Sequence, residues 1–149
     1  MKGNLPAAAG WQLLEVVRRP DVGRGFVVSD ELQAEPVGAL RHVRRELRAL
    51  RAAGIPPDSA LGAPDVERIV FTCPDDRSST TFYVLKCKPG HWRLYFVADA
   101  NKRRITFLFA VAKKTQRRDT DDVKKCCARL KEYEAQTNPV LGSLDYLCS

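Results

Sequence analysis

Three apolar segments separated by short turns lie between Phe82 and Ala112, and they constrain the fold more than any other part of the chain. They read FYVLKCK, WRLYFVA and RITFLFAV, and each is rich in the aromatic and β-branched residues that favour strands. Pro89 and Gly90 separate the first two segments, and the polar residues Asp99 to Lys102 separate the second from the third. We therefore predict antiparallel strands at about residues 82–88, 92–98 and 104–111.

The alternation of side chains along these segments also predicts how the strands pair. A two-residue turn at Pro89 and Gly90 places Lys86 opposite Arg93. Continuing the same register places Trp92, Leu94 and Phe96 opposite Phe109, Phe107 and Ile105. One face of the sheet is then apolar throughout, and the other is expected to be open and to carry Lys86, Arg93, Tyr95, Arg104 and Thr106.

One helix is predicted before this strand region and one after it. Apolar residues recur at helical spacing from about residue 36 to 53, and again from about 120 to 135. Asp121 and Asp122 suit the positive end of the second helix. Further strands are predicted at Trp11 to Arg18, at Phe26 to Val28 and in the VERIVFT segment. The predicted fold class is α+β.

A chain of 149 residues with 44% apolar composition fits one domain with one core, which we assign to residues 1–149. Residues 1–30 are either an N-terminal extension or contain a first strand. No apolar run reaches the length of a membrane helix, and charged residues interrupt the N-terminal segment too early for a secretory signal. These features predict a cytoplasmic protein without a membrane partner.

The five cysteines are odd in number, and they include no CxxC pair and no nearby histidine cluster at zinc spacing. We therefore predict reduced thiols, no metal site and no cofactor. Adjacent Cys126 and Cys127 are interpreted as small residues at the core boundary of the last helix, rather than as a redox pair.

Positive charge is concentrated in the strand region. Residues 82–118 contain ten Lys and Arg and one acid, Asp99, whereas the whole chain has a net charge of +7. Lysine and arginine interleaved with Tyr and Trp are typical of a surface that binds nucleic acid. The ordinary alternative is a solvated face with long cations that spread apart. The direct opposition of Lys86 and Arg93 favours a binding function, because two like charges in register destabilise a sheet.

The order of these segments and three short motifs resemble the RelE/ParE superfamily of bacterial toxins, closest to its HigB-like, phage-derived branch. The motifs are a strand of the R-x-x-Y-F type, a strand ending in F-x-K-K-T, and a helix ending in R-L-x-x-Y. In this chain the matching residues are Arg93, Tyr95 and Phe96, with one residue between Arg and Tyr, and Phe109, Lys113, Lys114 and Thr115, with three residues between Phe and Lys. Arg129, Leu130 and Tyr133 match the third motif at its own spacing. The resemblance is clear over residues 82–134 and loose over residues 35–81.

The resemblance implies a microbial-ribonuclease type of fold, with an antiparallel sheet flanked by helices. It implies a toxin that cleaves mRNA in the translating ribosome, inhibits translation and arrests growth until a cognate antitoxin, of helix-turn-helix type, silences it. The nucleophile is the 2′-hydroxyl of the RNA, so the protein positions the strand and stabilises the phosphorane charge without a metal.

Site residues follow from the resemblance and from the predicted register. Lys86 and Arg93 are assigned to the scissile phosphate, and Lys113 or Lys114 to proton transfer. The residues assigned to RNA binding are Tyr95, Arg104, Arg117, Arg118 and Lys88. His91, Tyr133 and Tyr146 are weaker candidates for proton transfer.

Two alternative functions stay open at this point. ParE-like members of the superfamily inhibit DNA gyrase without cutting RNA, and a basic sheet can also serve as a non-catalytic nucleic-acid-binding module. The same scaffold is compatible with all three functions.

Overall fold

The computed structural model describes residues 11–17, 28–33, 40–53, 65–74, 77, 79–87, 92–112, 120–135 and 140–148. Its strands are β1 (Gln12–Val17), β2 (Val66–Thr72), β3 (Ser79–Cys87), β4 (Trp92–Asp99), β5 (Arg104–Ala112) and β6 (Val140–Ser143). Its helices are α2 (Val28–Gln33), α3 (Arg41–Ala53), α4 (Thr120–Glu134) and the short 3-10 helix η4 (Asp145–Cys148). No helix in these ranges is long and apolar enough to cross a membrane.

The six strands form one sheet in the order β2-β3-β4-β5-β1-β6. The α+β class and the three central strands are confirmed, but the sheet is mixed, because β1 runs parallel to β5. The expectation of a purely antiparallel sheet is therefore wrong. Only the three central strands were paired from the sequence, and all of those pairs are antiparallel. The parallel strand β1 comes from the distant N-terminal part of the chain.

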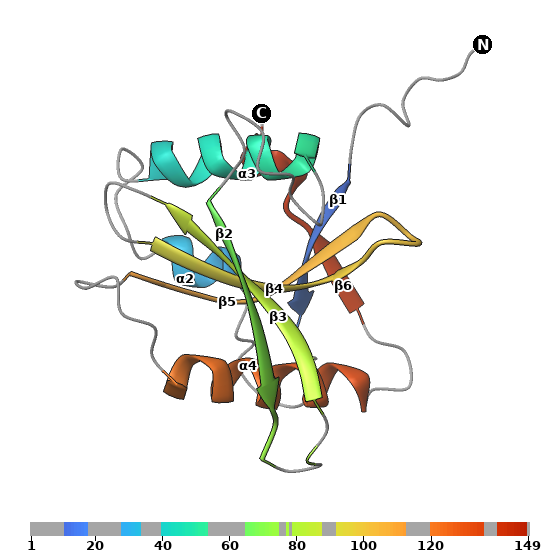
Figure 1. Ribbon diagram of the computed structural model, residues 1–149. Helices are drawn as coiled ribbons and strands as arrows, with labels where there is room; N and C mark the ends of the chain where they lie inside the picture. The colour runs from blue at the N-terminus through green and yellow to red at the C-terminus, as the bar shows by residue number, and fades with distance from the viewer. Residues whose placement is uncertain are drawn as a thin grey trace.

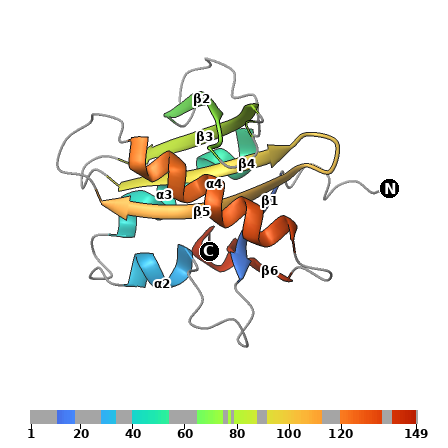
Figure 2. The same cartoon turned by 90° about the horizontal axis from the view of Figure 1, so that it is seen from below.

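Helices cover both faces of the sheet, with α3 on one side and α4 on the other (Figure 1). Seen from below, α4 crosses the sheet, and β2 and β6 lie at its two edges (Figure 2). The α3 side buries Leu47, Leu50, Leu94, Phe96 and Phe107, and the α4 side buries Phe82, Tyr95, Leu108, Val123 and Cys126. Each face of the sheet is therefore part of a core.

The two long helices form where the sequence predicts them, although α3 begins at Arg41 and residues 34–39 lie outside the described part. The predicted strand ending at Val28 is not found there, because Val28 is the first residue of α2. A tertiary contact supports this helix start: the backbone N–H of Ser29 donates to Glu15 Oε1 at 2.8 Å. Glu15 is 14 residues away from Ser29 in the sequence, so a local sequence pattern cannot predict this contact.

The predicted register of β3 and β4 is confirmed, since Lys86 pairs with Arg93 and Val84 with Tyr95. The predicted register of β4 and β5 is wrong. Trp92 pairs with Ala112, Leu94 with Ala110 and Phe96 with Phe107, and a bulge lies between Tyr95 and Phe96.

The turn between β4 and β5 explains this difference. Asp99 pairs with Arg104, so the connection is shorter than the predicted register requires. The Asp99 Oδ1 atom accepts backbone N–H bonds from Asn101 at 3.0 Å and from Lys102 at 3.2 Å. Arg103 then adopts a left-handed conformation with φ of 51°. A tight turn stabilised by Asp99 therefore shifts β5 relative to β4.

Candidate functional site

Lys86 and Arg93 lie opposite each other near the end of the sheet where β3 ends and β4 begins. The repulsion expected between them is relieved by a third strand. Lys86 Nζ lies 2.9 Å from Glu67 Oε1 on β2, and the two side chains are 24% and 35% exposed. Glu67 pairs with Val84, so it is the diagonal neighbour of Lys86 across the two strands. Lys86 is thus a partly accessible cation with a carboxylate beside it.

Arg93 is not on an open surface. Its side chain points to the α4 side of the sheet, and the residue is only 3% exposed. The expectation of an open basic face is therefore wrong at this position.

Tyr95 is fully buried on the same side of the sheet, between the strands and α4. Its hydroxyl donates to Asp122 Oδ2 at 3.2 Å, and its ring stacks on Phe109 with 6.1 Å between centroids. Burial, and then the charge of Asp122 and the hydrogen bond to it, raise the pKa of the Tyr95 hydroxyl well above its ordinary value. In this structure the ring is not available to stack on a nucleotide base.

Arg104 lies at the opposite end of β5 from this group. It pairs with Asp99 and Gln12, whereas Arg93 pairs with Val111. Val111 lies seven positions after Arg104 in β5, which corresponds to about 23 Å along a strand. The structure therefore brings Lys86, Arg93 and Tyr95 together and leaves Arg104 apart.

The remaining assigned residues lie outside the described ranges. They are Lys88, Lys113, Lys114, Arg117 and Arg118, together with His91. Lys113 directly follows Ala112 in the chain, and Ala112 pairs with Trp92, the neighbour of Arg93. Their assigned roles stay predictions.

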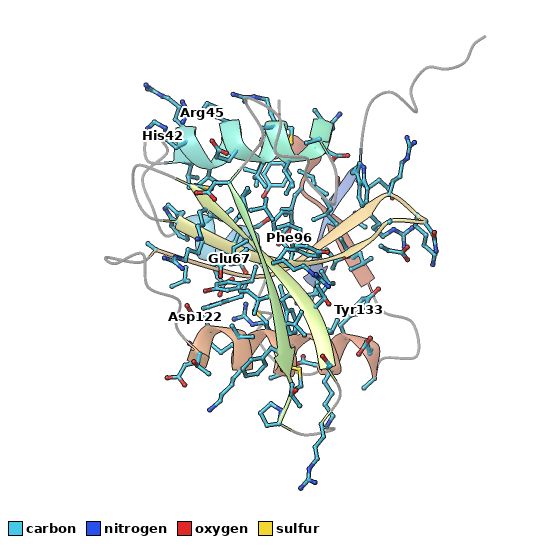
Figure 3. All side chains as sticks on the ribbon, in the orientation of Figure 1. His42, Arg45, Glu67, Phe96, Asp122 and Tyr133 are labelled. Atoms are coloured by element: carbon cyan, nitrogen blue, oxygen red, sulfur yellow. A yellow bond between two sulfur atoms is a disulfide. The ribbon has the colours of Figure 1, made fainter. Side chains whose placement is uncertain are left out.

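Two acidic residues near this group were not assigned to it from the sequence. Asp122 was interpreted only as a helix-terminal charge, yet it is 5% exposed and accepts the Tyr95 hydrogen bond. Glu67 belongs to the alternating VERIVFT strand, and pairing that strand with β3 would have placed it near Lys86. Figure 3 labels both residues on the ribbon. The basic group is therefore balanced by carboxylates.

The R-L-x-x-Y motif on α4 has a clear structural role. Arg129 Nη1 donates to Leu108 O at 2.8 Å and to Glu31 Oε1 at 3.1 Å, and Nη2 donates to Glu31 Oε2 at 3.1 Å. Glu31 Oε1 also accepts the backbone N–H of Ala110 at 3.0 Å. The pairing of β1 with β5 ends at Phe107, so Arg129 and Glu31 satisfy backbone groups of β5 beyond that point.

Cys73 and Cys127 form a disulfide that connects the end of β2 to α4. The prediction of reduced thiols is wrong for this pair, whose positions 54 residues apart carry no spacing signal. Cys126 is a free, buried thiol, in agreement with its interpretation as a core residue. Among the described residues, no group of three His, Cys, Asp or Glu side chains is arranged to hold a metal ion.

Comparison with known proteins finds no matching family model, no matching curated protein and no matching solved structure. The resemblance to the RelE/ParE superfamily is therefore an expectation from the sequence alone.

Proposed function

We propose that this protein is a toxin of the RelE/ParE type that cleaves mRNA in the translating ribosome. On this proposal it acts in the cytoplasm, arrests growth by stopping translation, and is silenced by an antitoxin of helix-turn-helix type. The RelE-like arrangement of the fold is part of the same proposal. It is supported by the order of elements, in which a first strand and two helices precede an antiparallel meander and a last long helix.

One observation carries the proposal. Lys86 and Arg93 are paired across β3 and β4, at the same end of the sheet where β5 leads into the Lys113-Lys114 sequence. Cations from two paired strands thus lie at the end of the sheet where β5 ends, and Lys113 and Lys114 come next in the sequence. A phosphate bound there would lie beside the Lys86 ammonium, and positive groups stabilise the charge of a developing phosphorane.

Lys86 is assigned to the phosphate, because its side chain is partly accessible. Glu67 becomes a candidate proton acceptor for the 2′-hydroxyl, beside Lys113 and Lys114, since its carboxylate lies 2.9 Å from the Lys86 ammonium. Arg93 is buried, so we assign it to positioning the charged groups around it rather than to direct contact with RNA.

The test is to express the protein in a bacterial host without an antitoxin and to map new 5′ ends on a translated reporter message. We expect cuts within the reading frame for the native chain, loss of those cuts for Lys86→Met, and normal cuts for the matched surface variant Lys102→Met. Loss of cuts in Glu67→Gln with retained binding would identify Glu67 as the proton acceptor. Persistent cuts in a folded Lys86→Met variant would disprove the assigned site.

A second candidate function is inhibition by binding, without cleavage. The complete burial of Tyr95 and the near-complete burial of Arg93 favour it, because both residues were expected on the surface that contacts RNA. Growth arrest with an intact reporter message would support this candidate, and DNA-damage signalling would then identify gyrase as the target.

A further inference from the structure

The outer surface of α3 carries a row of arginines that no site described above uses. Val43, Leu47 and Leu50 are buried against the sheet, whereas Arg41, Arg45 and Arg48 are exposed. At 3.6 residues per turn, these three arginines fall within a sector of about 60° on the side of the helix directly opposite the buried stripe. Arg45 is 59% exposed and projects from α3 (Figure 3).

The row is poorly neutralised by its own helix. The α3 sequence RHVRRELRALRAA has five arginines and one acid, Glu46. Glu46 lies at the side of the row, 20% exposed, with 3.8 Å between its Oε1 and Arg45 Nε. Arg51 Nη1 lies 3.9 Å from Asp145 Oδ1 of η4, so the positive charge of α3 is partly neutralised at its C-terminal end. The more N-terminal arginines carry the strongest positive charge on the helix. Over about 10 Å of helix axis, three guanidinium groups thus face outward together.

The side chains on this surface indicate which kind of polyanion fits. Arginine presents a planar donor fork that matches phosphate oxygens, so a row of arginines suits a phosphate backbone. The exposed residues of α3 include no aromatic and no large aliphatic side chain, only Arg and Ala. Stacking on single-stranded bases needs aromatic rings, and protein interfaces need apolar or aromatic anchors. Both alternatives are therefore less suitable than a duplex.

We propose that the outer face of α3, through Arg41, Arg45 and Arg48, binds the phosphate backbone of a nucleic-acid duplex. This surface lies on the opposite side of the sheet from α4 and from the Tyr95–Asp122 contact (Figure 1). The proposal does not depend on cleavage of RNA. If the proposed function holds, the natural duplex is a ribosomal RNA helix, and α3 would anchor the protein while the sheet end acts on the message.

The test compares three forms of the full chain by fluorescence anisotropy with labelled duplexes of about 16 base pairs, one of RNA and one of DNA. The docking variant is Arg41→Gln/Arg45→Gln/Arg48→Gln. The matched control is Arg68→Gln/Arg77→Gln/Arg103→Gln, which removes the same charge from three exposed arginines outside α3. Circular dichroism and melting curves are measured to check that each variant is folded.

We expect the docking variant to bind at least about tenfold more weakly at moderate salt, and its plot of log affinity against log salt to be less steep by about 2 to 3. The control is expected to change much less. Tighter binding of RNA than DNA would identify RNA as the natural duplex, and equal binding would support a shared phosphate contact. Equal losses in the two variants, or tighter binding of polyglutamate than of either duplex, would disprove the proposal. Reporter cuts that persist in the docking variant would show that cleavage does not require duplex binding by α3, so the two proposals can fail independently.

Discussion

At the residue scale, Tyr95 shows how a single position can follow a family pattern and still have an unexpected role. Its place in the strand segment RLYF suggested an exposed ring that contacts RNA. In the structure it is fully buried, and its hydroxyl binds Asp122 of α4. The residue therefore connects the sheet to the helix that covers it.

We predict that Tyr95→Phe lowers the free energy of unfolding by about 1 to 2 kcal/mol, because Asp122 loses a buried hydrogen-bond donor. Urea unfolding at neutral pH measures this change. RNA binding should be unaffected, since the ring is retained and is not at the surface. A variant as stable as the native chain would show that the hydrogen bond contributes nothing.

The raised pKa of Tyr95 also predicts a pH dependence, because burial beside Asp122 disfavours the phenolate in the folded state. The unfolded chain releases this proton near the ordinary tyrosine pKa of about 10, whereas the folded chain keeps it. Stability from this group is therefore complete below about pH 10 and is lost as the pH rises further. The difference in urea midpoint between the native chain and Tyr95→Phe should shrink above that pH, and a constant difference would contradict it.

At the element scale, the contact between α2, β5 and α4 depends on Glu31 and Arg129. Their side chains are 19% and 13% exposed, and they satisfy backbone groups of β5 that no strand pairs. We predict that Arg129→Met costs about 2 to 4 kcal/mol, because it leaves the largely buried carboxylate of Glu31 without its cation. Glu31→Gln should cost less, and the double variant should cost less than the sum of the two. Unfolding experiments on the four chains of this cycle measure the coupling, and additive costs would contradict it.

The disulfide is a second element-scale contact, because it joins the end of β2 to α4 across the sheet. Closing a loop with a sequence separation of 54 residues is expected to stabilise the fold by about 4 kcal/mol through the entropy of the unfolded chain. Dithiothreitol should lower the melting temperature of the native chain. It should not change that of Cys73→Ala/Cys127→Ala, and equal responses would argue against the bond.

At the scale of the whole molecule, the sheet has two buried faces, and this changes what its charges can do. Helix α3 covers one core and α4 the other, and Arg93 is enclosed rather than exposed. The outer face of α3 carries exposed arginines. The two-sided covering is therefore the reason that the expected open face is absent.

The two cores share one sheet, so we predict that they unfold together. Leu47→Ala on the α3 side should cost about 2 to 5 kcal/mol, and Val123→Ala on the α4 side about 2 kcal/mol. Each variant should show one transition in urea, with circular dichroism and tryptophan fluorescence coincident. Two separate transitions would show that the faces unfold independently.

Local pattern in the sequence determined the α+β class, the two long helices, the three central strands and the pairing of Lys86 with Arg93. These features depend on periodicity and on a short turn, and both are local. Tertiary structure alone decided the parallel contact of β1 with β5, the bulge beside Tyr95, and the disulfide between Cys73 and Cys127. It also decided that α4 covers the face carrying Arg93, because the packing of a distant helix depends on the whole fold. The pairing of Arg93 with Lys86 was therefore predicted from the sequence, but the burial of Arg93 was not.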